Sequence, residues 1–523
     1  MEQKNKKKIS TQTIIKLLLA VVLLSLSAFL LKGDVWTFWT WWLLAGVMGF
    51  AAMPVTGRLF WRFEDKGWIF SKVLAIAATG FLTWFLTAIR LIPFNALTCA
   101  AVTILCAVIC FFLLRKESKE KTECFPVDRI SLIYWEELLF FLAFLIWTYL
   151  AGFRPAAYGT EKFMDYGFME AMMRSTTLPA RDLWYSEGHI NYYYGGQYFA
   201  VFLTKLSHTK VELTYNLMRT FVAGLAFAMP FSLVYQMMSD RMKGLQKSEK
   251  VIKGLPFAAG FTAGTAVSIA GNMHYVIYAQ IIPLIEKLTG KEVSSYWFPD
   301  ATRYIGYNPY REEDRTIHEF PCYSFVLGDL HAHVVNIMFV LLVIALLYVW
   351  LRGVRKKTVP VETSMKDGKF WKEQLLMPHL LVISALLGMF QWTNFWDFVI
   401  YYVVTLGTVL FANIIRFQGK IKKIMVVTFA QMAEIYLLAY LVILPFTLQF
   451  DTMVDGIGIA KYHSYFYQLL VLWGLPTVLT ITFVITILWE KLRGMEHKSL
   501  YRLRNAIRTA ELFALIMGLC ALG

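Results

Sequence analysis

Charged residues are scarce in this chain. Asp, Glu, Lys and Arg make up 17% of its 523 residues and hydrophobic residues make up 58%, whereas soluble domains average about 25% and 45–50%. The mean hydropathy is +0.52. A water-soluble core of this size needs a polar coat that this composition cannot supply. The surplus apolar surface must therefore face lipid.

Several sequence features that define other protein classes are also missing. None of the six cysteines forms a C-x-x-C pair, and three of them lie in one apolar run, which argues against a disulfide framework or a thiolate zinc site. The predicted cytoplasmic loops contain no GxxxxGK[ST] run, so direct nucleotide hydrolysis has no support. No small-residue cleavage site follows the apolar run 14–31. We therefore expect this run to be a retained first span rather than a signal peptide.

Acidic residues are fewer than basic ones: 36 Asp and Glu stand against 51 Lys and Arg, a formal charge of +15. The basic excess occurs in short clusters between apolar runs rather than on one patch, which argues against a nucleic-acid partner. Basic loops of membrane proteins stay in the cytoplasm, so we place the N-terminus and every basic loop there. These loops are 4–8, 55–66, 115–129, 239–253, 352–373, 416–423 and 491–508.

Apolar runs long enough to cross a bilayer predict a bundle of about 12–14 transmembrane helices. The candidate spans are 13–31, 36–54, 69–92, 96–114, 130–152, 218–238, 255–280, 334–351, 378–394, 397–414, 424–446 and 465–488. Keeping all basic loops in the cytoplasm requires one crossing between residues 190 and 239. The short stretch 192–206 is therefore predicted to be a half-helix or a membrane-edge helix. The expected fold is an all-α polytopic bundle in the plasma membrane.

This topology assigns roles to the parts of the chain. Residues 1–129 are N-terminal transmembrane helices with no assigned role, and 491–523 are a cytoplasmic basic loop and the start of a further span. Residues 130–490 form a membrane catalytic domain by the family resemblance described below. Four loops face outward: 153–191, 281–333, 394–397 and 447–464. Almost every unusual polar residue of the chain falls in one of them, and this coincidence is the main functional clue.

The first outward loop carries two carboxylates one helical turn apart, Glu161 and Asp165. At 100° per residue, Asp165 shares a face with Phe168 and Met172, so it lies in the apolar stripe of a helix at the outer membrane surface. Two carboxylates on one face suggest a shared proton, a metal ion, or a general base with its neighbour. The alternative is that Asp165 caps the helix or reaches the lipid headgroups.

The same loop continues into Asp182, Trp184, Asn191 and the triplet Tyr192, Tyr193 and Tyr194, followed by two glycines. Tyrosine and tryptophan are expected at a membrane interface, which explains some of these residues. An amide and aromatic rings beside glycines also resemble a surface that binds a sugar or a lipid headgroup.

Two later segments carry further polar residues. The segment from Glu319 onward contains Asp329, His331 and His333, a set that can ligate a divalent ion such as Mg or Mn or, with protonated histidines, bind a phosphate. Histidines that merely hydrogen-bond at the interface are the alternative. A tight hairpin between two predicted spans contains Asn394, Trp396 and Asp397, where a turn-forming role is as plausible as a functional one.

Three of these motifs together resemble a known family. They are Glu161-Lys162-x-Met164-Asp165 with Pro179-x-x-Asp182-x-Trp184 and Ile190-Asn191-Tyr192-Tyr193-Tyr194; Glu319-Phe-Pro-x-x-Ser324-Phe-x-x-Gly328-Asp329-Leu330-His331-x-His333; and Asn394-x-Trp396-Asp397-Phe398. In this order they resemble the YYY family of uncharacterised polytopic membrane proteins, named for its tyrosine triplet. The resemblance covers roughly residues 130–490 and departs at Val399, where a proline is expected.

More distantly, the chain resembles the GT-C superfamily of integral-membrane glycosyltransferases, which place an aspartate on an outward juxtamembrane helix. The resemblance implies a sugar transferase at the outer membrane face that uses a polyprenyl-phosphate sugar and an unknown acceptor, with Asp165 as base and Glu161 beside it. By the same resemblance, arginines of the outward loops hold the donor phosphate: Arg303, Arg311 and Arg315. The alternative function is a transporter or flippase for a lipid-linked or amphipathic solute.

A single site requires distant residues to converge. We expect Asp165, Asn191, Glu319, Asp329 and His331 to line one cavity. The remaining predicted substrate-binding residues are Asp182, Trp184, Tyr192, Tyr193, Tyr194, Asn394, Trp396 and Asp397. No cofactor is certain, and the candidate metal ligands are Asp329, His331 and His333.

Overall fold

The computed structural model describes residues 10–120, 124–243, 249–291, 296–354, 364–452 and 461–493. Over these residues the chain is a set of helices without a strand. The expectation of an all-α polytopic bundle is confirmed. Most of the predicted segment 491–523 lies outside the described residues.

The chain divides into two compact units. Unit 1 comprises residues 1–269 and 324–451, and unit 2 comprises residues 270–323 and 452–523. The helices of unit 1 are α1 Thr11–Leu31, α2 Val35–Leu59, α3 Trp68–Ala88, α4 Ala96–Glu120, α5 Ile130–Ala151, α6 Lys162–Arg174, α7 Gly195–Ser207, α8 Val211–Lys243, α9 Glu249–Ser268, α12 Ala332–Val354, α13 Gly368–Leu375, α14 Pro378–Thr393, α15 Phe395–Phe417 and α16 Ile421–Thr447.

Unit 2 holds four short elements and one long helix. The short elements are the π-helix η3 Val276–Ile281, α10 Ile282–Thr289 and the 3-10 turns η4 Phe298–Ala301 and η5 Glu312–Asp314, and the long helix is α17 Phe466–Arg493. The short helix α11 Pro321–Leu327 crosses from unit 2 into unit 1. The predicted span 255–280 is wrong in its second half, because α9 ends at Ser268. Gly271 and Asn272, which follow closely, are residues that favour helix ends.

Nine helical segments of the described chain are long and apolar enough to cross a membrane, or ten if the bent pair α13–α14 is one span. One of the nine, Thr11–Leu59, contains both α1 and α2. Between residues 190 and 239 only α8 has the length of a span, as the charge pattern predicts. The predicted half-helix at 192–206 is α7, which is 13 residues long.

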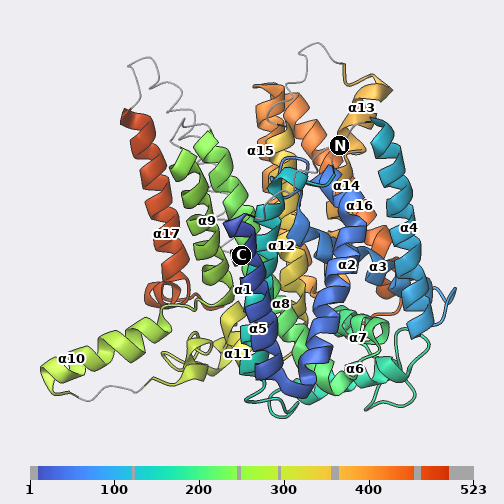
Figure 1. Cartoon of the computed structure of the whole chain (residues 1–523). Helices are drawn as coiled ribbons and strands as arrows, with labels where there is room; N and C mark the ends of the chain where they lie inside the picture. The colour runs from blue at the N-terminus through green and yellow to red at the C-terminus, as the bar shows by residue number, and fades with distance from the viewer. Residues whose placement is uncertain are drawn as a thin grey trace, which may run out of the picture. The chain divides into compact units, whose positions relative to one another are not determined.

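Helix α7 is buried inside unit 1. Every residue from Gly195 to Lys205 is buried, and the helix packs against α3, α4, α8, α12 and α14. A Cβ at Gly195 would come within 2.9 Å of the Trp392 carbonyl oxygen, so this close approach to α14 needs glycine. Figure 1 shows α6 and α7 together at one end of the bundle and α13 at the other end.

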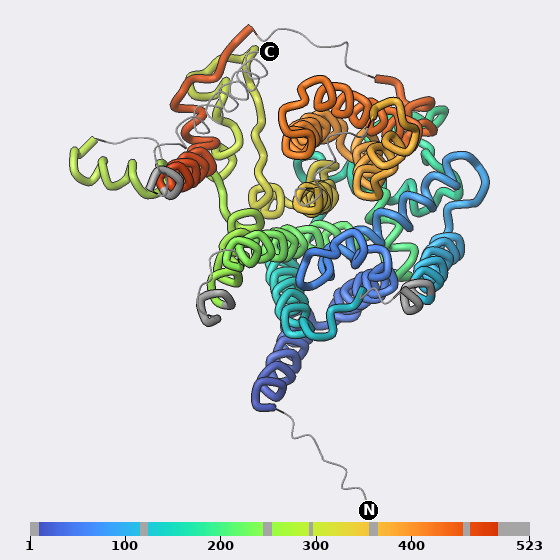
Figure 2. Tube along the Cα trace, turned by 90° about the horizontal axis from the view of Figure 1, so that it is seen from above, coloured from blue at the N-terminus to red at the C-terminus, as the bar shows by residue number. Residues whose placement is uncertain are grey.

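An aromatic core holds α7 against its neighbours. The rings of Trp84 on α3 and Trp392 on α14 stack with centroids 4.3 Å apart, and Tyr198 of α7 lies 5.1 Å from Trp392. Seen from above in Figure 2, α14, α15 and α16 lie side by side, and these three helices pack on one another. Such contacts orient spans in a bilayer, where no hydrophobic effect favours one helix face over another.

Candidate functional site

Four polar side chains of unit 1 meet beside the first turn of α6. Glu161 and Asp165 come from this turn, and Asp329 and His331 come from the connection between α11 and α12. His331 Nε2 lies 2.9 Å from Glu161 Oε2, and His331 Nδ1 lies 3.6 Å from Asp165 Oδ2 and 3.7 Å from Asp329 Oδ2. We call these four residues the acidic cluster.

A sharp turn brings the second pair of residues to α6. Gly328 has φ +92°, and a Cβ there would lie 2.4 Å from Arg219 Nη1 on α8. Both the positive φ and the close approach need glycine. After this turn, the Leu330 amide donates to the Tyr215 hydroxyl at 3.3 Å, and α12 begins directly after His331.

Asp165 is the most deeply enclosed member of the acidic cluster. Its side chain is 0% exposed, and its Oδ1 accepts a hydrogen bond of 2.7 Å from Gln197 Nε2 on α7. Its Oδ2 has no hydrogen-bond donor among the described residues. Burial raises the pKa of Asp165 to about 6, although His331 and the Gln197 bond oppose the rise and Asp329 and Glu161 add to it.

Exposure increases in order across the cluster. The side chain of Asp165 is 0% exposed, that of His331 19% and that of Glu161 60%. The imidazole therefore lies between the buried carboxyl and the accessible Glu161. From the accessible side, His331 and Glu161 are reached before Asp165.

Basic residues border the cluster on one side. Lys162 Nζ and Arg219 Nη1 both lie next to Gly328, the residue before Asp329. Burial lowers the pKa of Lys162, and the Asp329 charge counteracts this effect. Asp329 itself accepts from the Thr160 hydroxyl at 2.6 Å. This side of the site combines two cations with one buried carboxylate.

Aromatic side chains of the loop after α6 pack beside Phe168 of this helix. Tyr192 and Tyr193 stack with ring centroids 4.1 Å apart, and Phe168 lies 5.6 Å from Tyr192 and 6.0 Å from Trp184. Burial raises the pKa of Tyr192, and its Tyr193 neighbour adds to the effect. Asp182 positions this loop, because its Oδ1 accepts from the backbone amide of Trp184 at 2.7 Å.

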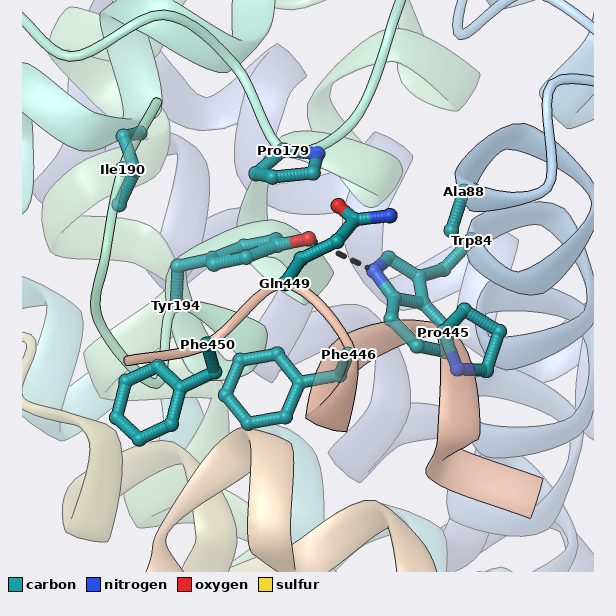
Figure 3. Close-up of a pocket in the computed structure, with 9 residues that line it drawn as sticks. All are labelled: Trp84, Ala88, Pro179, Ile190, Tyr194, Pro445, Phe446, Gln449 and Phe450. Atoms are coloured by element: carbon teal, nitrogen blue, oxygen red, sulfur yellow. Dashed lines mark hydrogen bonds between the residues drawn. The ribbon is translucent and has the colours of Figure 1, made fainter. Parts of the chain in front are cut away.

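The side chain of Tyr194, the last tyrosine of the triplet, is buried and hydrogen-bonded within the protein. The Tyr194 hydroxyl accepts a hydrogen bond of 3.0 Å from Trp84 Nε1, as Figure 3 shows. The pocket around this pair has a free volume of about 10 Å³, close to what one water needs. It is lined by Trp84, Ala88, Pro179, Ile190, Tyr194, Pro445, Phe446, Gln449 and Phe450.

The Asn191 side chain forms hydrogen bonds with the backbone of a distant segment and not with the acidic cluster. Its Nδ2 donates to the Asp451 carbonyl at 3.0 Å, and its Oδ1 accepts from the Asp451 amide at 3.0 Å. Of the predicted convergent residues, Asp165, Asp329 and His331 do meet. Asn191 binds this other segment instead, and Glu319 belongs to unit 2.

The hairpin between α14 and α15 is a hydrogen-bonded turn. Asp397 Oδ2 accepts from Asn336 Nδ2 at 2.7 Å and from Asn394 Nδ2 at 2.8 Å. Trp396 points outward and is exposed. These bonds favour the turn-forming alternative for Asn394 and Asp397.

The candidate metal ligands do not assemble into a recognisable ion site. Within the described parts of the chain, no three His, Cys, Asp or Glu side chains are arranged to hold a metal ion. His333 lies on α12 with its Nε2 3.4 Å from the Ser324 hydroxyl, and its ring centroid is 5.7 Å from that of His331. The predicted set Asp329, His331 and His333 is therefore not formed in this arrangement.

The predicted phosphate-binding arginines all lie in unit 2. Arg311 Nη2 donates to the Tyr465 hydroxyl at 3.2 Å, and its guanidinium lies 4.7 Å from the Tyr462 ring centroid. Arg315 donates to the Tyr310 hydroxyl and lies 4.7 Å from that ring centroid. Arg303 follows η4. Their role in phosphate binding stays a prediction.

A family model for an uncharacterised membrane protein family, DUF2298, matches residues 78–523. The chain belongs to this family. The match begins within α3, which is earlier than the predicted limit at residue 130. Membership confirms a polytopic membrane protein. Neither the curated proteins nor the solved structures contain a match to this DUF2298 chain.

Some residues of the site were not predicted from sequence. Gln197 supplies the hydrogen bond to Asp165, and Arg219 lies behind Gly328. A signal for Arg219 was present, because a cation inside a span is costly and usually marks a functional or structural contact. Gln197 follows the glycine pair at the start of a mostly apolar helix, which is a weaker signal of the same kind.

Proposed function

We propose that this DUF2298 protein is a membrane glycosyltransferase that uses a polyprenyl-phosphate sugar. The observation that carries the proposal is the enclosed Asp165 carboxyl, 3.6 Å behind His331 Nδ1, with His331 Nε2 toward the accessible side. A carboxylate at this distance stabilises a protonated imidazole by its charge, which supports a general-base role for His331. The resemblance to the GT-C superfamily supplies the substrate class.

In the proposed reaction, the acceptor hydroxyl oxygen forms a bond to the anomeric carbon of the sugar. The bond from that carbon to the phosphate oxygen breaks, and the polyprenyl phosphate leaves with the electron pair. The hydroxyl proton passes to His331 Nε2, and the ionised Asp165 stabilises the resulting imidazolium. Glu161, which is mostly exposed, moves aside to admit the acceptor.

This assignment changes the role expected from sequence, where Asp165 is the base itself. A fully enclosed carboxyl cannot reach a substrate hydroxyl without a conformational change, whereas His331 can. A pKa near 6 keeps Asp165 mostly ionised at neutral pH. It can then balance the charge that His331 gains in the reaction.

The residues around the acidic cluster suit both the phosphate and the sugar of the proposed donor. Lys162 and Arg219 place positive charge beside the cluster, where a leaving phosphate needs it. The Tyr192 and Trp184 rings offer apolar faces for a sugar. We place this face outside the plasma membrane with the N-terminus in the cytoplasm, because the basic loops lie at the other ends of α5, α8 and α12.

The transporter alternative has less support. An apolar groove of about 530 Å³ runs between α2, α3, α4 and α14, with lining residues such as Val47, Ala78 and Leu386. None of these helices carries a member of the acidic cluster. The groove suits hydrocarbon chains of lipid rather than a polar solute on its way across the membrane.

The test is a transfer assay in membranes that contain the natural acceptors, with a radiolabelled polyprenyl-phosphate sugar. We expect Asp165→Asn and His331→Ala each to lower transfer about 100-fold or more, since general-base catalysis contributes about 10²–10⁴. Glu161→Gln should lower it less. The matched control is Glu212→Gln, which changes an exposed acid of α8.

Two results would count against the proposal. Absence of any transfer by the wild-type protein, tested with several sugars, would reject the glycosyltransferase assignment. Full transfer by a folded Asp165→Asn variant would reject the roles of the Asp165–His331 pair and favour the transporter.

A further inference from the structure

A second pair of acids lies in unit 1 at the end of the bundle opposite α6. Asp65 belongs to the turn between α2 and α3 and is 2% exposed, and Glu136 belongs to α5 and is 0% exposed. Their carboxyl groups lie within hydrogen-bonding reach of each other. Neither residue belongs to the acidic cluster, so the chemistry of this pair is independent of the proposed transfer activity.

Asp65 accepts hydrogen bonds from backbone amides at the start of α3. Its Oδ1 accepts from the Gly67 amide at 3.1 Å, and its Oδ2 accepts from the Trp68 amide at 2.9 Å and from the Ser232 hydroxyl at 3.3 Å. These bonds satisfy backbone amides at the start of α3, where a carboxylate also matches the helix dipole. Asp65 is therefore best suited to be the ionised member of the pair.

Glu136 has the opposite environment. Neither of its carboxyl oxygens has a hydrogen-bond partner among the described residues, although both are buried. The Ser232 hydroxyl lies near it, but it has a single proton, which it donates to Asp65. A buried carboxylate without donors is costly, whereas a protonated carboxyl can donate to an acceptor.

The nearby cations are occupied by other acids. Lys72 Nζ lies 3.0 Å from Glu137 Oε2, and Glu64 binds both Lys243 at 2.6 Å and Arg129 at 3.2 Å. The remaining ionisable groups around the pair are Tyr235 and, further along the same end, Arg62, Asp240, Tyr348 and Arg352. Asp240 and Arg352 pair with each other at 3.2 Å.

We propose that Asp65 and Glu136 form a proton-binding site in which one proton is shared, with the Glu136 O–H donating to Asp65. Two carboxylates in contact have no hydrogen between them when both are ionised, so the contact becomes a hydrogen bond only when a proton is bound. The unpartnered oxygens of Glu136 are then explained. The bound proton joins the α3 cap to α5.

Binding of this proton has a consequence for stability. In the unfolded chain both acids ionise near pH 4, so at neutral pH the folded state holds one proton more than the unfolded state. Stability contributed by the pair is therefore fully present at low pH and is lost as pH rises until the proton leaves the folded site. Release would place two charges between α3 and α5.

Infrared spectroscopy of the purified full-length protein tests the site directly, since protonated carboxyls have a C=O stretch distinct from that of carboxylates. At about pH 8 we expect the Glu136→Gln difference spectrum to show the loss of about one protonated carboxyl per chain. Glu212→Gln, an exposed acid changed in the same way, should show none. An unchanged protonated-carboxyl signal in Glu136→Gln would overturn the proposal.

A second variant keeps the proposal testable if Glu136→Gln does not fold. Asp65→Asn keeps one of the two capping oxygens and adds an amide that donates to Glu136, so it should also remove the protonated-carboxyl signal. A second measurement is the melting temperature as a function of pH. We expect the wild type to lose stability relative to Glu136→Gln as pH rises, and a pH-independent difference would contradict the shared proton.

Discussion

The buried Asp165 carboxyl makes the stability of the folded protein depend on pH. The relevant change is Asp165→Asn, which keeps the size of the side chain and an oxygen that accepts from Gln197 Nε2. It removes the group that titrates. Any pH dependence that disappears with this substitution therefore belongs to Asp165 and its coupling to His331.

The size of the effect follows from the pKa of Asp165, which burial raises from 3.8 to about 6. The difference is about two pH units, on the order of 3 kcal/mol at 1.36 kcal/mol per unit. The folded pKa is the higher one, so the folded state holds the proton more tightly than the unfolded state. Its stabilising contribution is fully present below about pH 4 and is lost as pH rises through about 6.

The assay is thermal unfolding in detergent from about pH 4 to pH 7.5. We expect the wild type to become less stable relative to Asp165→Asn as pH rises, by about 3 kcal/mol over the range. Asp128→Asn, an exposed acid beside α5, is the matched control and should follow the wild type. A difference between wild type and Asp165→Asn that does not change with pH would refute the reasoning.

Two further changes test the scaffold of the site. Tyr194→Phe leaves the buried Trp84 N–H without its acceptor. We expect the free energy of unfolding to fall by about 1–3 kcal/mol. A fall no larger than that caused by the exposed Tyr185→Phe would contradict the structural role of Tyr194. Gly328→Ala must accommodate a Cβ 2.4 Å from Arg219 Nη1 at φ +92° and should cost at least about 1–2 kcal/mol. It should also lower transfer by displacing the turn; a variant as stable and active as wild type would show that the turn can relax.

Many of the long apolar helices could be predicted from sequence because they depend on properties that each segment carries by itself. A run of apolar side chains has a favourable transfer free energy into lipid whatever its neighbours are. The charge of a loop acts in the same local way. These two properties were enough to predict the short α7 and the single crossing at α8.

The burial of Asp165 could also be predicted, because the 3.6-residue period of a helix places it on the apolar face of α6. Its partner could not. His331 is distant in the chain, and it follows a turn in which Gly328 has φ +92°. In the structure this segment is a turn at Gly328 followed by helix α12.

The separate roles of the three tyrosines could not be predicted from sequence either. The triplet consists of identical residues in adjacent positions. Even so, Tyr192 packs on Phe168 of α6, whereas Tyr194 is buried against Trp84. Only the packing of α7 between α3 and α14 separates their roles.

The contact between Asp65 and Glu136 depends on tertiary structure alone. Sequence shows two acids near the ends of two spans, each of which could face water or a cation. Whether they meet depends on how α3 and α5 pack in unit 1. Hydropathy and charge therefore determined which segments are long and apolar enough to cross a membrane, because these are properties of single residues. Three-dimensional packing decided which polar groups share a site, because hydrogen bonds and burial depend on neighbours that the chain brings together only when it folds.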